Sequence, residues 1–159
     1  MKKTMKTLVL GLCLLLIGQM TASALAYATA SGKSAQTAVV YSPSLADEVV
    51  RQVNAERARA GLRALRVSAE LSRAARVRAV EITRKFSHTR PDGSAWRTVS
   101  SAAYGENIAV GQRTADKVMA AWLTSSGHRA NLLRASYGSI GVCAVISGGV
   151  TYWVQLFGK

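Results

Sequence analysis

The sequence predicts an α+β domain in which helices pack on an antiparallel sheet. Apolar residues recur at helical spacing over much of 45–125, and they alternate in two runs over 139–157. Helical patterns followed by a pair of strands are typical of the α+β class. A chain of 159 residues has about the length of one ordinary domain.

The N-terminal segment has the pattern of a secretory signal peptide over 1–26. Three lysines precede an apolar run at 8–17, which is shorter than the roughly 20 residues that a membrane-spanning helix needs. Ala-Leu-Ala at 24–26 fits a cleavage site, and Ala-Ser-Ala at 22–24 competes with it. We expect a secreted protein, extracellular or in the cell envelope, without a membrane span after cleavage.

The next segment, 27–42, contains small and polar residues without periodicity, so we expect a flexible leader. A folded domain is predicted over 43–159. Its first helix is predicted over 45–60, where apolar residues lie at helical spacing. Gly61 is placed to end that helix.

Two further helices are predicted, each preceded by a residue suited to cap it. Ser68 precedes a helix over 69–85, and Thr114 precedes one over 115–125. A short helical turn is expected near 128–134.

Turn and strand signals fill the rest of the domain. Arg-Pro-Asp-Gly at 90–93 predicts a tight turn. The alternating runs around Gly148-Gly149 predict a β-hairpin over 139–157. Two strands need further partners to form a stable sheet, and 107–110 and 95–99 are the candidates.

The composition is basic, with 21 Lys and Arg, 8 Asp and Glu, and a formal net charge of +13. The segment 51–97 contains twelve basic and four acidic residues, and we expect most of its arginines on the solvent faces of the first two helices. Such a face could simply be solvated, or it could attract an anionic cell-surface polymer. The arginines are not interleaved with aromatic residues, and export also argues against a specific nucleic-acid partner.

Common catalytic motifs are absent: the chain contains no phosphate-binding loop, dinucleotide fingerprint, nucleophile elbow or H-E-x-x-H pattern. The two histidines, His88 and His128, each follow a predicted helix, and Glu106 lies between them in sequence. If their loops converge, these side chains could ligate a divalent cation or exchange protons near neutral pH. Judged by spacing alone, a histidine that follows a helix is more often a cap or a hydrogen-bonded structural residue.

Several longer motifs occur in a fixed order along the chain. They are Asn54-Ala55-Glu56-Arg57 with Gly61-Leu62, FSHTRPDG at 86–93, GENIA at 105–109, WLTSSGHRANLL at 122–133 and YWVQLF at 152–157. With these motifs, the sequence resembles the CAP (SCP-like) superfamily of cysteine-rich secretory, antigen 5 and pathogenesis-related proteins, in its short bacterial form. The resemblance covers about 45–158 and implies a three-layer α-β-α sandwich around an antiparallel sheet.

The resemblance also implies a cleft that carries two histidines and two acids. His88, Glu106 and His128 match three of these positions, but Ser125 occupies the neighbourhood of the second acid. Fewer carboxylates should weaken the affinity of this cleft for a divalent cation. We expect that no cofactor is required. Zn²⁺ or another divalent cation stays a candidate ligand of the three matching residues. Ser125 and Arg129 are the further candidates for ligand contact.

Several other residues are expected to have structural roles. Trp122 should lie in the core, and Asn107 should hold a loop through backbone hydrogen bonds. Arg129 and Asn131 are candidate caps of the short helix. Cys143 has no intramolecular disulfide partner after cleavage, because Cys13 belongs to the predicted signal peptide. Since Cys143 lies in an alternating strand pattern, we expect it to be a buried, unreactive thiol.

The resemblance implies a secreted, non-enzymatic binding module for a small apolar ligand, such as a lipid or sterol, or for a divalent cation. Two alternatives stay open. One is a metal-dependent hydrolase with Glu106 as the base and His88 and His128 as ligands. The other is a basic adhesin held on the cell surface by charge.

Overall fold

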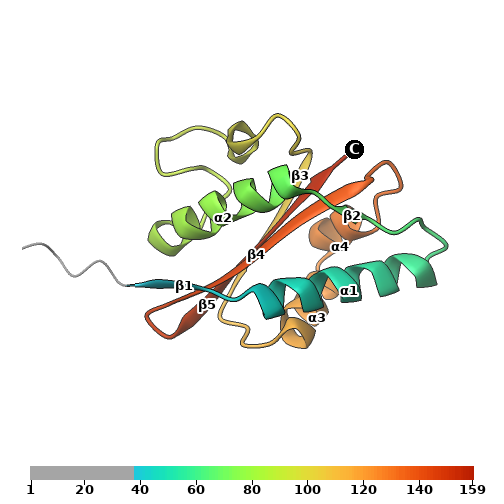
Figure 1. The fold of residues 1–159 in the computed structure, drawn as a ribbon, viewed down its shortest axis with the longest axis horizontal. Coiled ribbons are helices and arrows are strands. Elements are labelled where there is room, and N and C mark those ends of the chain that lie inside the picture. Colours follow the sequence, from blue (N-terminus) through green and yellow to red (C-terminus); the bar gives the residue numbers. More distant parts are fainter. Residues whose placement is uncertain (1–37) are drawn as a thin grey trace, which may run out of the picture. The chain divides into compact units, whose positions relative to one another are not determined.

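The computed structural model describes residues 38–159, which form three layers with a mainly antiparallel sheet in the middle (Figure 1). The strand order is β1-β4-β5-β3, and β2 pairs in parallel with β4 at one end. The strands are β1 (Val39–Tyr41), β2 (Arg66–Val67), β3 (Gly105–Val110), β4 (Ser139–Ser147) and β5 (Val150–Gly158).

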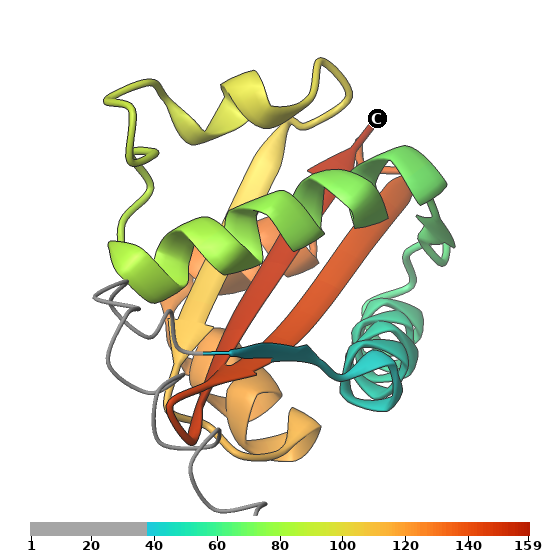
Figure 2. The ribbon, with the colours of Figure 1, turned by 60° about the vertical axis from the view of Figure 1, so that its left-hand side comes forward.

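Helices cover both faces of the sheet. Figure 2 shows α2 in front of the strands and α3 and α4 behind them. Ser68 Oγ accepts a hydrogen bond from the backbone N–H of Leu71, and Thr114 Oγ1 accepts one from Lys117, so both predicted N-caps are present. The helices are α1 (Pro43–Arg59), α2 (Ala69–Arg84), the 3₁₀ helix η1 (Trp96–Val99), α3 (Ala115–Thr124) and α4 (Ser126–Leu132).

The hairpin of β4 and β5 is the centre of the sheet. Its register runs from Ser139 opposite Gly158 to Ser147 opposite Val150. Gly148 and Gly149 connect the strands with φ angles of 57° and 76°, which residues other than glycine rarely adopt. The predicted hairpin is therefore confirmed.

Both faces of the hairpin are buried, because each packs against different helices. Ile140, Val142 and Ala144 of β4 belong to a core shared with α1 and α3. The intervening Cys143 and Val145 belong to a second core beneath α2. The alternation in the sequence thus separates two apolar cores, and the predicted three-layer α-β-α sandwich is confirmed.

Two residues with expected structural roles lie in these cores. Trp122 is buried in the core shared by α1 and α3. Cys143 is a buried, free thiol, and burial raises its pKa to about 11. The thiol therefore stays protonated near neutral pH, which makes it a poor nucleophile.

A close approach between α2 and β4 depends on Gly141. A Cβ atom at this position would lie 2.2 Å from the carbonyl carbon of Leu71 and 2.4 Å from the backbone nitrogen of Ser72. No side chain can be accommodated at such distances from backbone atoms. Gly141 therefore sets how closely α2 lies on the sheet.

Two predictions of local structure are wrong. Residues 96–99 form η1 rather than a strand, and only Ala95 makes an isolated bridge, to Thr89. Within the predicted leader, Val39–Tyr41 form β1 because they pair with β4 from Val145 to Ser147. A three-residue edge strand has too short a pattern to be recognised from sequence.

Most arginines of α1 and α2 face solvent, as predicted, and two of them are exceptions. Arg57 and Arg78 have no solvent exposure. Both side chains find hydrogen-bond partners inside the protein, which compensates the cost of burying their charges. The surface charge of these helices comes from their other basic residues.

The predicted signal peptide, 1–26, and the leader up to residue 37 lie outside the described residues. Within 38–159, no helix combines the length and the apolar character needed to cross a bilayer.

Candidate functional site

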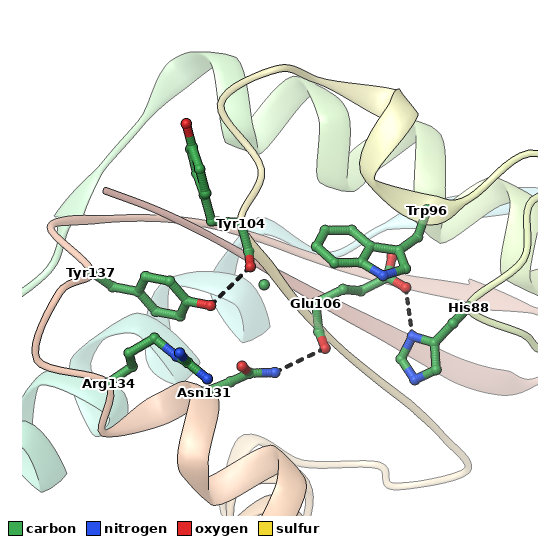
Figure 3. A pocket seen from close by; sticks show the side chains of 8 residues that line it. His88, Trp96, Tyr104, Glu106, Asn131, Arg134 and Tyr137 are labelled. Carbon is green, nitrogen blue, oxygen red and sulfur yellow. Dashed lines mark hydrogen bonds and ion pairs between the residues drawn. The ribbon is translucent and has the colours of Figure 1, made fainter.

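An open pocket of about 480 Å³ lies where β3, the loop that carries His88, η1 and the segment around α4 meet (Figure 3). Figure 3 shows His88 and Trp96 at one end of it and Arg134 and Tyr137 at the other. Ligand pockets commonly have volumes of roughly 300–1,000 Å³. The pocket is lined by His88, Trp96, Tyr104, Gly105, Glu106, Asn131, Arg134 and Tyr137.

Glu106, on β3, is the central acid of the site, although its side chain has no solvent exposure. Arg78 donates from Nε to Glu106 Oε2 at 2.7 Å and from Nη2 to Oε1 at 3.3 Å. His88 Nδ1 lies 2.8 Å from the same Oε1. Because an ionised carboxylate only accepts hydrogen bonds, Nδ1 of His88 is the donor in this contact. His88 is 54% exposed, so it is the accessible member of this group.

The same arginine joins the pocket to the loop after α2. Arg78 Nη1 donates to Glu81 Oε2 at 2.7 Å, and Nη2 donates to the carbonyl of Ser87 at 2.7 Å. Glu81 also accepts hydrogen bonds from Arg90. Burial opposes ionisation of Glu81, but the hydrogen bonds from Arg90 and Arg78 outweigh it and hold its pKa below the ordinary value. Arg78 and Arg90 thus form a network with two carboxylates, those of Glu81 and Glu106, in which positive and negative charges are equal in number. This network fixes the loop that carries His88.

Side-chain amides connect α4 to β3 beneath the pocket. Asn131 Nδ2 donates to the carbonyl of Glu106 at 3.2 Å and to Asn107 Oδ1 at 2.9 Å. Asn107 Nδ2 donates to the carbonyl of His128 at 3.2 Å and to Gln155 Oε1 at 3.0 Å. Asn107 makes a backbone hydrogen bond, as expected, but to a residue of α4 and not to a loop. Asn131 reaches the strand instead of capping its own helix, because α4 lies directly beside β3.

The aromatic end of the pocket depends on a glycine. Tyr137 donates from its hydroxyl to the carbonyl of Tyr104 at 2.9 Å and stacks on Phe157 at 5.4 Å between ring centroids. A Cβ atom on Gly105 would lie 2.5 Å from the Tyr137 hydroxyl oxygen. The absence of a side chain at Gly105 therefore allows Tyr137 to reach β3.

The other predicted site residues lie outside the pocket wall. His128, in the first turn of α4, is partly buried. Its pKa is lowered mainly by this burial and to a smaller extent by the positive charge that His88 can carry. Ser125 is partly buried between α3 and α4, and Arg129 is exposed on α4. Neither lines the pocket. The structure thus brings His88 and Glu106 into contact and leaves Ser125 and Arg129 aside.

The residues present do not fit the predicted metal site. Among residues 38–159, no three His, Cys, Asp or Glu side chains are arranged to hold a metal ion. Both carboxylate oxygens of Glu106 already accept hydrogen bonds, and the guanidinium of Arg78 would repel a cation placed beside them.

We therefore expect Zn²⁺ to leave the melting temperature of the chelator-treated protein unchanged. A zinc ion at 100 times its dissociation constant would add about 2.7 kcal/mol to the free energy of unfolding, an effect that differential scanning fluorimetry detects readily. A saturable rise in melting temperature that disappears in His88→Ala would contradict this expectation.

Sequence reasoning missed most of the pocket wall. Trp96 and Tyr104 follow the tight turn at 90–93, while Arg134 and Tyr137 follow α4, so no common spacing connects them. Arg78 had one usable signal: it lies three residues before Glu81 on the helix whose apolar stripe it shares. Helical position shows that it could turn inward, but only the tertiary structure identifies Glu106 as its partner.

Comparisons with known proteins agree with this architecture. The family described as "CAP: Cysteine-rich secretory protein family" matches residues 50–157. Uncharacterized protein YkwD of Bacillus subtilis (strain 168) is 39% identical over 118 residues, covering 69% of this chain and 45% of its own length. This chain therefore spans less than half of that relative.

Two solved structures share the fold at low sequence identity. An outer surface protein from Borrelia burgdorferi has a TM-score of 0.66 at 18% identity, covering 77% of this chain and 98% of that one. An extracellular protein containing an SCP domain from Bacillus anthracis has a TM-score of 0.64 at 22% identity, covering 72% and 40%. With a family match over most of the described residues, this chain belongs to the CAP family of cysteine-rich secretory proteins.

Proposed function

We propose that this chain is an exported CAP-domain binding module that holds a small ligand in the pocket between His88 and Tyr137. The observation that carries the proposal is the pocket itself, open and about 480 Å³ in volume, with Trp96, Tyr104 and Tyr137 in its wall. Aromatic side chains provide contact area for an apolar group. His88, Glu106 and Asn131 in the wall are already hydrogen-bonded, so binding requires little reordering of these residues.

A binding role is favoured over hydrolysis because Glu106 is already hydrogen-bonded and the pocket wall offers no hydroxyl of serine or threonine and no thiol. Glu106 is enclosed by Arg78 and His88, which leaves it unable to take a proton from a water in the pocket without breaking those contacts. The pocket wall contains no serine, threonine or cysteine that could act as a nucleophile. The same hydrogen bonds to Glu106 give no support to metal-dependent hydrolysis, because they occupy the oxygens that would ligate the metal.

Export is supported by the pattern of the N-terminal segment and by the extracellular or surface proteins that share the fold. N-terminal sequencing of the protein recovered from the medium or the envelope fraction tests it. A mature chain that begins after residue 24 or 26 supports export, and an intact N-terminus contradicts cleavage.

Replacing Tyr104 by alanine should deplete the ligand that co-purifies with the mature protein. Tyr104 is 52% exposed and its backbone carbonyl accepts the hydrogen bond from Tyr137, so the substitution removes pocket wall without removing that bond. Untargeted mass spectrometry of extracts from wild type and Tyr104→Ala measures the difference. We expect at least a tenfold loss of any specifically bound small molecule.

Tyr41→Ala is a matched control for that experiment. Tyr41 is 44% exposed and has the guanidinium of Arg76 over its ring, yet it lies on β1, away from the pocket wall. Equal ligand content in wild type and both variants would argue against binding in this pocket.

A further inference from the structure

The pocket presents positive charge to a ligand, although an acid lies in its wall. The side chain of Glu106 is fully buried, and its charge is offset by Arg78. Arg134 also lines the pocket and is exposed. Over residues 38–159, Arg134 takes part in no ion pair, so its charge is available to a ligand.

Arg134 is held against the aromatic end of the pocket. Its guanidinium carbon is 5.4 Å from the ring centroid of Tyr137, which also lines the pocket. Such stacking restricts the positions of a long side chain and keeps its charge beside the space that a ligand would fill. Lys159 Nζ lies 4.5 Å from the ring centroid of Tyr104, but Lys159 itself does not line the pocket.

The opposite end of the pocket differs in chemistry. Figure 3 shows Trp96 there, with His88 beside it. Trp96 packs against the apolar core beneath α2 and is only partly exposed, so it offers a fixed aromatic surface. A ligand that spans the pocket would meet the guanidinium of Arg134 at one end and the indole of Trp96 at the other.

We propose that this pocket binds a small amphipathic anion, with its carboxylate or phosphate group on Arg134 and its apolar body toward Trp96. This inference rests on the proposed function and narrows its ligand class. A planar guanidinium can donate two parallel hydrogen bonds to a carboxylate or phosphate. A neutral apolar ligand would instead cover the charge of Arg134 without compensating it.

The proposal can be tested with three probes that share one alkyl chain. Octyl phosphate, octanoate and octanol are titrated into the mature protein below their micelle concentrations, and binding is followed by calorimetry. We expect at least one of the anions to bind ten times or more tightly than octanol, and more weakly as salt is added. Inorganic phosphate alone should bind at least tenfold more weakly than octyl phosphate, because it lacks the apolar body.

Two variants separate a specific site from general attraction to a basic protein. Arg134→Gln should weaken anion binding about tenfold or more, which is the size expected for loss of a charged hydrogen bond. Arg113→Gln removes the same charge from an exposed loop residue outside the pocket wall and should leave affinity unchanged. Circular dichroism establishes that both variants are folded.

The outcomes distinguish this inference from the proposed function. If octanol binds as tightly as the anions and Tyr104→Ala abolishes that binding, the pocket binds ligands but anion recognition is rejected. Equal losses in Arg134→Gln and Arg113→Gln also overturn the inference, as does the failure of every probe to bind. Co-purification of a ligand that depends on Tyr104 would still support the proposed function in those last two cases.

Discussion

Replacing Arg78 by glutamine is expected to lower the free energy of unfolding by about 3–5 kcal/mol, the usual cost of removing one partner of a buried ion pair. The substitution leaves the fully buried carboxylate of Glu106 with His88 alone and removes a hydrogen bond from Glu81. Urea denaturation, followed by circular dichroism, measures the change. The loop that carries His88 should also loosen, since Arg78 holds the carbonyl of Ser87.

Arg73→Gln is the matched control, because Arg73 is an exposed arginine on the same helix. Its effect should stay within about 0.5 kcal/mol. If Arg78→Gln does not fold, the double variant Arg78→Met/Glu106→Gln removes both buried charges and should be more stable than Arg78→Gln. Similar small losses for Arg73→Gln and Arg78→Gln would show that the buried network contributes little.

The same variant should change how stability depends on pH. The pKa of Glu81 is held below its ordinary value, so its ionised form stabilises the fold above the unfolded-state pKa, and this contribution is lost as the pH falls through the lowered pKa. Without Arg78, less of this contribution remains to be lost. Unfolding free energies measured across the acidic range should therefore fall less steeply in Arg78→Gln than in wild type.

Replacing Arg57 by methionine is expected to cost about 3 kcal/mol or more, because a buried guanidinium holds carbonyl groups that have no substitute donor. Arg57 donates to the carbonyls of Arg63 and Leu132 at 2.9 Å each, to that of Arg134 at 3.1 Å and to that of Tyr137 at 3.4 Å. It therefore connects the end of α1 to the segment that follows α4.

Hydrogen exchange distinguishes a local role from a general loss of packing. Amides of residues 132–138 should exchange faster in Arg57→Met than expected from the global loss of stability. Arg57→Lys should recover only part of the stability, because an ammonium cannot reproduce the planar fork of donors. Arg59→Met, on the exposed end of the same helix, provides the control. Uniform exchange across the domain in Arg57→Met would contradict the local role.

These two arginines stabilise opposite sides of the pocket. Arg78 fixes the wall that contains Glu106 and His88, and Arg57 fixes the segment that contains Arg134 and Tyr137. Neither Arg57 nor Arg78 lines the pocket itself. They act by placing the residues that do, so their loss should weaken ligand binding together with stability.

The elements of the fold could be predicted because their signals are local. Ser68 and Thr114 cap the helices they precede, and Gly148-Gly149 produces the hairpin turn. The edge strand β1 and η1 were not predictable in this way. β1 exists because β4 offers a pairing edge, and residues 96–99 have no pattern that distinguishes a 3₁₀ turn from a strand.

The sequence by itself determined the family, the three main helices and the central hairpin, and it predicted that His88, Glu106 and His128 share one cleft. Only the tertiary structure decided how that acid is used, because Arg78 reaches Glu106 from a helix 28 residues earlier in the chain. Periodicity reports whether a side chain can turn inward, while its partner depends on which segments pack together. For this reason, only the structure shows that Arg57 and Arg78, in a segment whose basic residues mostly face solvent, are buried and hold the two sides of the pocket.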